Sequence, residues 1–130
     1  MPRPTLVVSA VCFRDTEGRI LTVRKRGTSK FMLPGGKLET DESPADAAVR
    51  EIREEIGVEL AVADLTLLGE WTTDAANEPD TSVTGTVYTA RLTAEPVASA
   101  EIDEVRWVVP GDPDLAPLLR ERVMPALGLA

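Results

Sequence analysis

Three acidic residues, Glu51, Glu54 and Glu55, lie close together near the middle of the chain, and their spacing suits a metal ion. In a helix they would span about 100° of the circumference, so their carboxylates could converge as hard oxygen ligands for Mg²⁺ or Mn²⁺. Without a cation this placement is unfavourable, because Glu51 and Glu55 repel each other at i,i+4 spacing and the helix dipole disfavours anions near a C-terminus. The alternative is a solvated helix face with an Arg50–Glu54 ion pair, which the three glutamates alone favour.

The helix that would carry these glutamates is well marked at both ends. Ser43 is a good N-cap, with Asp46 completing a capping-box pattern, and Pro44 suits the first helical position. Gly57 fits the left-handed position that ends a helix. Apolar residues in between repeat at three- and four-residue spacing and form one face, beside which the glutamates are expected to lie. They are Ala45, Ala48, Val49, Ile52 and Ile56. The sequence therefore predicts a helix over Pro44–Ile56.

Strand-like and loop-like segments alternate along the rest of the chain. A further helix is expected within 112–127, although Pro117 and Pro125 leave its ends open. Strands on both sides of one central helix, with a terminal helix, indicate a mixed α/β sheet covered by helices. The chain has no repeat or linker, which predicts one domain over residues 1–130. The expected strands are Thr5–Phe13, Arg19–Arg24, Val58–Val62, Leu65–Thr73, Val83–Thr93 and Val105–Val109.

Composition excludes several classes of site. The chain has no histidine, so a histidine base, a Ser-His-Asp triad and a His-ligated zinc are ruled out. Its single cysteine, Cys12, lies in an apolar run and is expected to be a buried, inert thiol. The net charge of −8 argues against nucleic-acid binding. With no long apolar stretch and no signal-peptide pattern, we expect a cytoplasmic protein that does not enter a membrane; a homodimer stays open.

A longer pattern surrounds the three glutamates and favours the metal site over the solvated face. It reads Gly36, five residues, Glu42, seven residues, Arg50-Glu51-Ile52, one residue, Glu54-Glu55, one residue and Gly57-Val58. This pattern resembles, with no departure, the signature of the Nudix hydrolase family, which MutT-type nucleotide pyrophosphohydrolases typify. Leu33–Glu39 resembles the family's usual lead-in, and Glu101–Trp107 resembles a common late segment.

This resemblance implies a fold and a set of roles. The fold would be an α/β/α sandwich with a mixed β-sheet, in which the signature forms a loop–helix–loop. The glutamates at positions 51, 54 and 55 match the family's metal-binding and catalytic glutamates, with Arg50 in the catalytic set. Glu42 matches a glutamate that lies near the metal or pairs with that arginine. The implied metal set comprises Gly36, Glu42, Glu51, Glu54 and Glu55.

The implied reaction is hydrolysis of a nucleoside diphosphate linked to another moiety, with Mg²⁺ as the cofactor and Mn²⁺ as a substitute. An acidic protein needs such cations to hold a polyanion. A carboxylate would be the general base, either one of the cluster or a late-loop acid, Glu101 or Glu104. Lys37 and Arg24 are the expected phosphate contacts. Other bases nearby, Lys25, Arg26 and Lys30, are expected to be solvated.

The sequence indicates the substrate less specifically than the reaction. Neither the proline typical of ADP-ribose pyrophosphatases nor the tyrosine of diadenosine-polyphosphate hydrolases follows the signature at the usual distance. By elimination we expect a small-molecule substrate, a nucleoside or deoxynucleoside triphosphate that includes oxidised purines. ADP-ribose or another nucleotide sugar is the alternative, and a non-catalytic nucleotide sensor is the alternative of another class. Candidates for contacting the base are Phe31, Trp71, Tyr88, Trp107 and Asn77.

Overall fold

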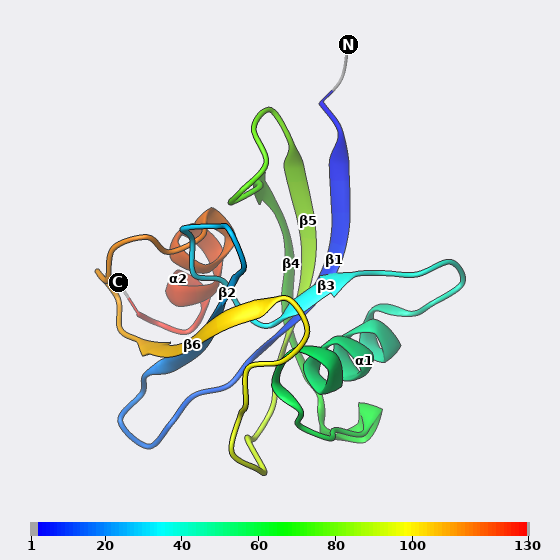
Figure 1. Cartoon of the computed structure of the whole chain (residues 1–130), viewed down its shortest axis with the longest axis vertical. Coiled ribbons are helices and arrows are strands. Elements are labelled where there is room, and N and C mark those ends of the chain that lie inside the picture. The colour runs from blue at the N-terminus through cyan, green and yellow to red at the C-terminus, as the bar shows by residue number, and fades with distance from the viewer. Residues whose placement is uncertain (1–2, 130) are drawn as a thin grey trace.

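The computed structural model describes residues 3–129 and contains two sheets, one long helix and shorter helical segments (Figure 1). One sheet has four strands in the order β3-β1-β5-β4, and the other pairs β2 with β6. β1 runs parallel to β5 and antiparallel to β3, so the larger sheet is mixed, as predicted. The strands are β1 (Thr5–Cys12), β2 (Ile20–Lys25), β3 (Gly35–Lys37), β4 (Thr66–Asp74), β5 (Ser82–Thr89) and β6 (Ile102–Val108).

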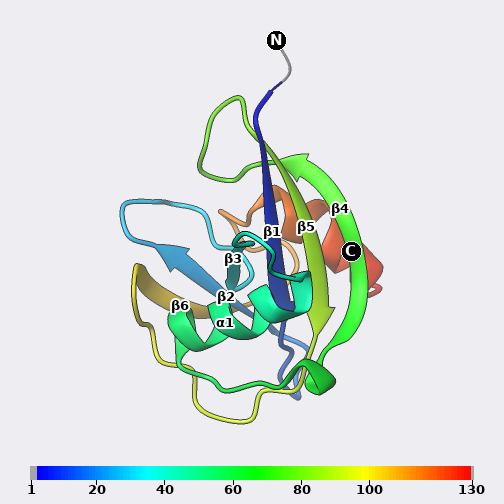
Figure 2. The same ribbon diagram turned by 90° about the vertical axis from the view of Figure 1, so that its right-hand side faces the viewer.

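Helical segments cover both faces of the four-stranded sheet. Successive side chains of a strand point to opposite faces, so β1 contributes to two separate clusters of buried residues. Val11 packs in the cluster that contains Ile52 of the long helix α1 (Pro44–Ile56), whereas Cys12 packs with Leu119 of the C-terminal segment. Figures 1 and 2 show α1 and the C-terminal helix on opposite sides of β1 and β5. The fold is therefore the expected α/β/α sandwich.

Local signals determine the ends of α1 as predicted. Ser43 Oγ accepts a 3.1 Å hydrogen bond from the Asp46 N–H, and Pro44 begins the helix. At the other end Gly57 adopts the left-handed conformation with φ of 70°, and its N–H donates to the Arg53 carbonyl. Glu55 differs from the expectation that all three glutamates lie beside the apolar face. It is buried among the residues of that face.

Three predicted strands are wrong in whole or in part. The one expected at Val105–Val109 is β6 (Ile102–Val108), which begins three residues earlier. Val58–Val62 forms no strand; the chain runs irregularly and then enters the short 3₁₀ helix η1 (Val62–Asp64). Val58 and Leu60 are buried all the same, because they pack into the cluster beneath α1 and have no neighbouring strand to pair with. The strand expected to reach Thr93 ends at Thr89.

Helical structure at the C-terminus runs from Pro117 to Ala126, within the predicted region 112–127 but starting later than its first residue. It contains a π-helical turn, η2 (Leu119–Val123), followed by α2 (Met124–Ala126). Pro125 explains the wide turn, since its ring has no N–H and would clash with the carbonyl four residues earlier in a regular helix. Within residues 3–129, no helix has both the length and the apolar character needed to span a membrane.

Candidate active site

Arg50 holds the acidic side chains of the signature together. Its guanidinium donates two 2.8 Å hydrogen bonds to the two carboxylate oxygens of Glu42 and one of 2.8 Å to Oε1 of Glu51. It also lies 3.5 Å from Oε2 of Glu54 and donates to the Lys37 carbonyl. Of the two roles left open for Glu42, the structure shows pairing with Arg50. This pairing, with a hydrogen bond from the Glu39 N–H, lowers the pKa of Glu42 to about 2.

Glu55 lies in a different environment from its neighbours on the helix. Its carboxylate is buried beneath the loop that leads into β3, and Oε1 accepts a 2.9 Å hydrogen bond from the Gly35 N–H. Burial raises the pKa of Glu55 to about 7, against the lowering effects of that hydrogen bond and of the Lys25 charge. A carboxyl group with this pKa can take up or release a proton near neutral pH.

The absence of a side chain at Gly36 leaves space for the Glu51 carboxylate. A β-carbon at position 36 would lie 2.5 Å from the Glu51 carboxyl carbon and 2.6–2.7 Å from its oxygens. With any side chain at position 36, the Glu51 carboxylate would have to move away from this strand. The sequence places a glycine here, fifteen residues before Glu51, and the contact between them supplies its physical reason.

The acidic groups fit a divalent cation by their chemistry. Glu51, Glu54 and Glu55 present carboxylate oxygens from one segment of α1, which are the ligands that Mg²⁺ prefers. Within residues 3–129, no group of three acidic or cysteine side chains already converges tightly enough to hold a metal. Arg50 instead neutralises Glu51 and lies near Glu54, whose side chain is 49% exposed. That the Gly36 carbonyl joins the ligands stays a prediction.

A cavity of about 270 Å³ opens beside the signature. The β3 segment Gly35–Lys37 lies on it, the end of β4 and the loop after it contribute residues 74–78, and Ala116 with the first helical residues of the C-terminal segment contributes residues 116–119. Most of the remaining lining side chains are aliphatic, among them Leu6, Val8 and Val83. A cavity of this kind suits the apolar part of a ligand whose charged part lies against the glycines.

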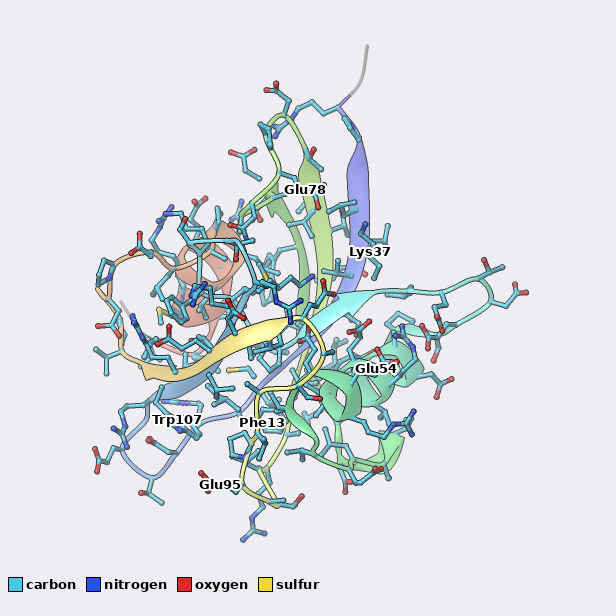
Figure 3. All side chains as sticks on the ribbon, in the orientation of Figure 1. Phe13, Lys37, Glu54, Glu78, Glu95 and Trp107 are labelled. Atoms are coloured by element: carbon cyan, nitrogen blue, oxygen red, sulfur yellow. The ribbon has the colours of Figure 1, made fainter. Side chains whose placement is uncertain are left out.

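Two lysines line this cavity, and only one of them was expected. Lys37, a predicted phosphate contact, ends β3 (Figure 3), and the two glycines before it belong to that strand and do not form the turn that the sequence suggested. Lys25 was expected to be a solvated loop charge, but β2 continues to this residue, so it shares the strand face of Leu21 and Val23 that looks toward α1. Continuing the alternation of Leu21 and Val23 by one step would have identified it.

Arg24, the second predicted phosphate contact, is not among the residues that line the cavity. Its guanidinium lies 3.5 Å from Glu104 and 4.0 Å from Asp103, and it donates to the Thr28 carbonyl. Adjacent residues of a strand point to opposite faces, so Arg24 and Lys25 cannot both reach the cavity. The predicted role fits Lys25 better than Arg24.

Glu101 and Glu104, the two late-loop acids, differ in the groups that surround them. Glu104 pairs with Arg24 and Arg106 and is therefore already neutralised. Glu101 precedes β6, and its charge acts on the Glu55 carboxyl, whose pKa it raises further. Of the two, Glu101 is the acid that the fold brings toward the signature.

None of the four candidate aromatics lines the cavity within the part of the chain described. Phe31 is buried beneath Arg106, whose guanidinium lies 4.1 Å from the ring centroid. The other three, Trp71, Tyr88 and Trp107, pack against the two cores. Asn77 does line the cavity. The cavity therefore provides none of these four aromatic rings for a base to stack on.

Comparison with known proteins identifies the family. The NUDIX domain profile matches residues 3–127. A MutT-like protein of Streptomyces ambofaciens is 38% identical over 65 residues, which is 50% of this chain and 42% of that protein. The CTP pyrophosphohydrolase of Escherichia coli is 42% identical over 62 residues, 45% of this chain and 44% of the relative. In each case the match spans less than half of the relative's length.

The similarity in three dimensions extends over nearly the whole chain. The crystal structure of a MutT protein from Methanosarcina mazei superimposes with a TM-score of 0.81, covers 98% of this chain and 96% of its own, and is 23% identical. At that identity the likeness shows the fold alone. The profile match, the complete signature and the shared sandwich agree, and this chain belongs to the Nudix family.

Proposed function

We propose that this chain is a divalent-metal-dependent pyrophosphohydrolase that converts a nucleoside or deoxynucleoside triphosphate, oxidised purines included, to the monophosphate and pyrophosphate. The observation that carries this proposal is the cavity of about 270 Å³ bounded by Gly35, Gly36 and two lysines, with the glutamates of α1 adjacent. Its size suits one nucleoside rather than a dinucleotide. The name of the CTP pyrophosphohydrolase relative agrees with this substrate class.

Glu51, Glu54 and Glu55 would hold the cation, with the Gly36 carbonyl as a further oxygen. A bound divalent ion supplies charge neutralisation for the diphosphate and lowers the pKa of water. Arg50 positions the carboxylates of Glu51 and Glu54 through its hydrogen bonds to both. Its pairing with Glu42 fixes the guanidinium in place.

Lys25 and Lys37 would contact the phosphates, since both line the cavity next to the glycines. Two carboxylates could take the proton of the attacking water. One is a carboxylate of the α1 cluster formed by Glu51, Glu54 and Glu55. Glu101 lies near enough to influence Glu55 and could instead act from the late loop.

A nucleotide sugar such as ADP-ribose is the second candidate, and one feature favours it. A shallow open depression of about 640 Å³, lined by residues 27–29 and 75–79, adjoins the cavity and shares Thr28 and Asn77 with it. It offers room for a second moiety beyond the nucleoside. A non-catalytic sensor is less well supported, because all four signature glutamates are present.

A product assay tests the proposal. The full chain is incubated with Mg²⁺ and each of the common nucleoside and deoxynucleoside triphosphates, 8-oxo-dGTP and ADP-ribose, and the products are separated by ion-exchange chromatography. Pyrophosphate and a monophosphate are expected from at least one triphosphate. AMP and ribose 5-phosphate from ADP-ribose alone would support the second candidate, and no turnover of any compound would contradict both.

A further inference from the structure

One wall of the cavity carries only aliphatic side chains among the residues that the structure describes. It lies on the face of β1 and β5 that the C-terminal helical segment covers, opposite α1 (Figure 2). The strands contribute Leu6, Val8, Ala10 and Val83, of which Leu6 and Val83 are partners in the β1–β5 register. The segment contributes residues 116–119, which are an alanine, a proline and two leucines.

Ser9 of β1 also lines the cavity, but its hydroxyl does not belong to this wall. The residue is fully buried, and its Oγ donates a 2.6 Å hydrogen bond to the Pro44 carbonyl at the start of α1. Neighbouring residues of a strand point to opposite faces, so the hydroxyl lies on the α1 side of the sheet. On the wall itself Leu118 packs against Gly85, where a β-carbon would lie 2.7 Å from the leucine Cδ2.

The polar side chains of the cavity come from other elements. Lys25 and Lys37 stand at the ends of β2 and β3, and the remaining polar residues lie in the loop after β2, at the end of β4 and in the loop that follows it. Two of them already have partners: Thr28 donates to the Lys25 carbonyl, and Asp74 pairs with Arg3. The cavity thus combines a cationic side at the glycines with an aliphatic wall.

This combination suits a diphosphate that carries a hydrocarbon group. The polar edge atoms of a nucleobase lose water against an aliphatic wall without gaining a hydrogen bond from it, which is unfavourable. A hydrocarbon group has no such atoms, and its burial there is favourable in proportion to its apolar area. The two lysines and the glutamates of α1 serve a diphosphate in the same way whatever group it carries.

We propose that the chain also hydrolyses diphosphate monoesters of aliphatic alcohols, with the hydrocarbon group against the wall of Leu6, Val8, Val83 and Leu118. The water oxygen forms a bond to one phosphorus, and the anhydride bond from that phosphorus to the bridging oxygen breaks. The bridging oxygen leaves on the other phosphorus, and a carboxylate of the site takes a proton from the water and releases it to solvent. The products are the alkyl monophosphate and inorganic phosphate, whichever phosphorus is attacked.

A series of n-alkyl diphosphates from methyl to octyl tests this inference, because its members share one charged group and differ only in apolar length. The full chain is assayed with Mg²⁺ for release of inorganic phosphate. We expect kcat/KM to rise about fourfold with each added methylene until the cavity is filled, and then to stay level. Equal values along the series, or no release from any member, would overturn the inference.

Two variants locate the hydrocarbon group. Val83→Thr keeps the shape of the side chain and adds a hydroxyl to the wall, and should lower the octyl-to-methyl ratio of kcat/KM at least about fivefold. Leu118→Ala enlarges the cavity beside Gly85 and should move the level part of the series to longer chains. The matched control is Val97→Thr, the same change at a residue that is 63% exposed and outside the lining, which should leave the ratio unchanged. A rising series that neither wall variant alters would overturn the inference.

The outcome for nucleotides is separate. Hydrolysis of a nucleoside triphosphate together with a flat alkyl series would overturn this inference and leave the proposed function standing. A rising alkyl series that responds to the wall variants, without turnover of any nucleotide, would support this inference and contradict the proposed substrate class. Where both kinds of diphosphate are hydrolysed, octyl diphosphate should inhibit nucleotide hydrolysis competitively, because both occupy one cavity, and non-competitive inhibition would overturn the shared site.

Discussion

The Gly35 N–H donates a 2.9 Å hydrogen bond to Oε1 of Glu55, a residue that is only 3% exposed. This contact joins the lead-in of the signature to its helix and places a carboxyl group in the core. Burial, reinforced by the charges of Glu51 and Glu101, raises the pKa of Glu55 to about 7 despite the hydrogen bond. The site thus holds one acid whose pKa lies well above the ordinary value of a glutamate.

Substituting Glu55→Gln should change how stability depends on pH. Glu55 has a folded pKa of about 7 against an ordinary value of 4.5. The folded state therefore binds more protons between these values, and the metal-free protein loses stability as pH rises through this window. Glu55→Gln should remove that loss and raise the free energy of unfolding at pH 8 by about 1–3 kcal/mol. Urea unfolding of the unsubstituted protein and of Glu55→Gln at pH 4.5 and pH 8 measures this pH dependence. An equal dependence in the two proteins would contradict the raised pKa of Glu55.

Two glycine substitutions should have different consequences. In Gly36→Ala the new β-carbon meets only the end of the Glu51 side chain, which can move aside. We expect little loss of stability and weaker metal binding. In Gly35→Ala the β-carbon would meet backbone atoms, with Ala10 Cα at 2.7 Å, which cannot yield cheaply. That variant should lose about 3 kcal/mol. Thermal unfolding and Mn²⁺ titration of the two variants distinguish these effects.

Arg50→Lys should weaken the hydrogen bonding of Glu42 and raise the pKa of that carboxyl group. A lysine cannot reproduce the two parallel hydrogen bonds of the guanidinium. The pKa of Glu42 should then rise from about 2 toward its ordinary value of 4.5. Carboxyl ¹³C chemical shifts followed through an acid titration give this directly. Glu39→Gln is the control, because Glu39 is the exposed outer partner of Arg50, and should move the Glu42 titration far less.

Glu54→Gln tests the metal assignment. The Glu54 side chain is half exposed, so the fold should be retained, while Mn²⁺ affinity falls and turnover drops by about a hundredfold or more. The electron paramagnetic resonance signal of free Mn²⁺ reports the binding. Glu59→Gln removes an equal charge just beyond the helix and should leave both unchanged. If the unsubstituted chain shows no saturable uptake even with nucleotide present, the metal assignment is wrong.

Lys25→Ala and Arg24→Ala should distinguish the roles of two neighbouring positively charged side chains. Lys25 lines the cavity, so its loss should raise KM for a triphosphate by about tenfold. Arg24 is engaged with Asp103 and Glu104, so its loss should affect stability and leave KM within about twofold. Steady-state kinetics and thermal unfolding of both variants check this. A larger KM effect in Arg24→Ala would restore the original prediction for that residue.

Features governed by neighbouring residues were predictable from the chain alone. The helix Pro44–Ile56 was predicted with its correct ends, because its caps are side-chain and backbone contacts within four residues. The signature itself was readable because its spacing is a local pattern on one loop–helix–loop. The strand at Val58–Val62 was wrong because apolar runs in a strand and in a buried loop look alike until a partner strand is present or missing.

The amino-acid order by itself determined which acids stand on one helix, where that helix begins and ends, and to which family the chain belongs. Contacts between distant segments decided the rest. They placed Glu55 in the core beneath Gly35, turned Lys25 rather than Arg24 toward the cavity, and brought Asn77 to its wall. Burial and charge depend on atoms that lie far away along the chain, so only the folded structure shows which of these groups are buried and which are paired.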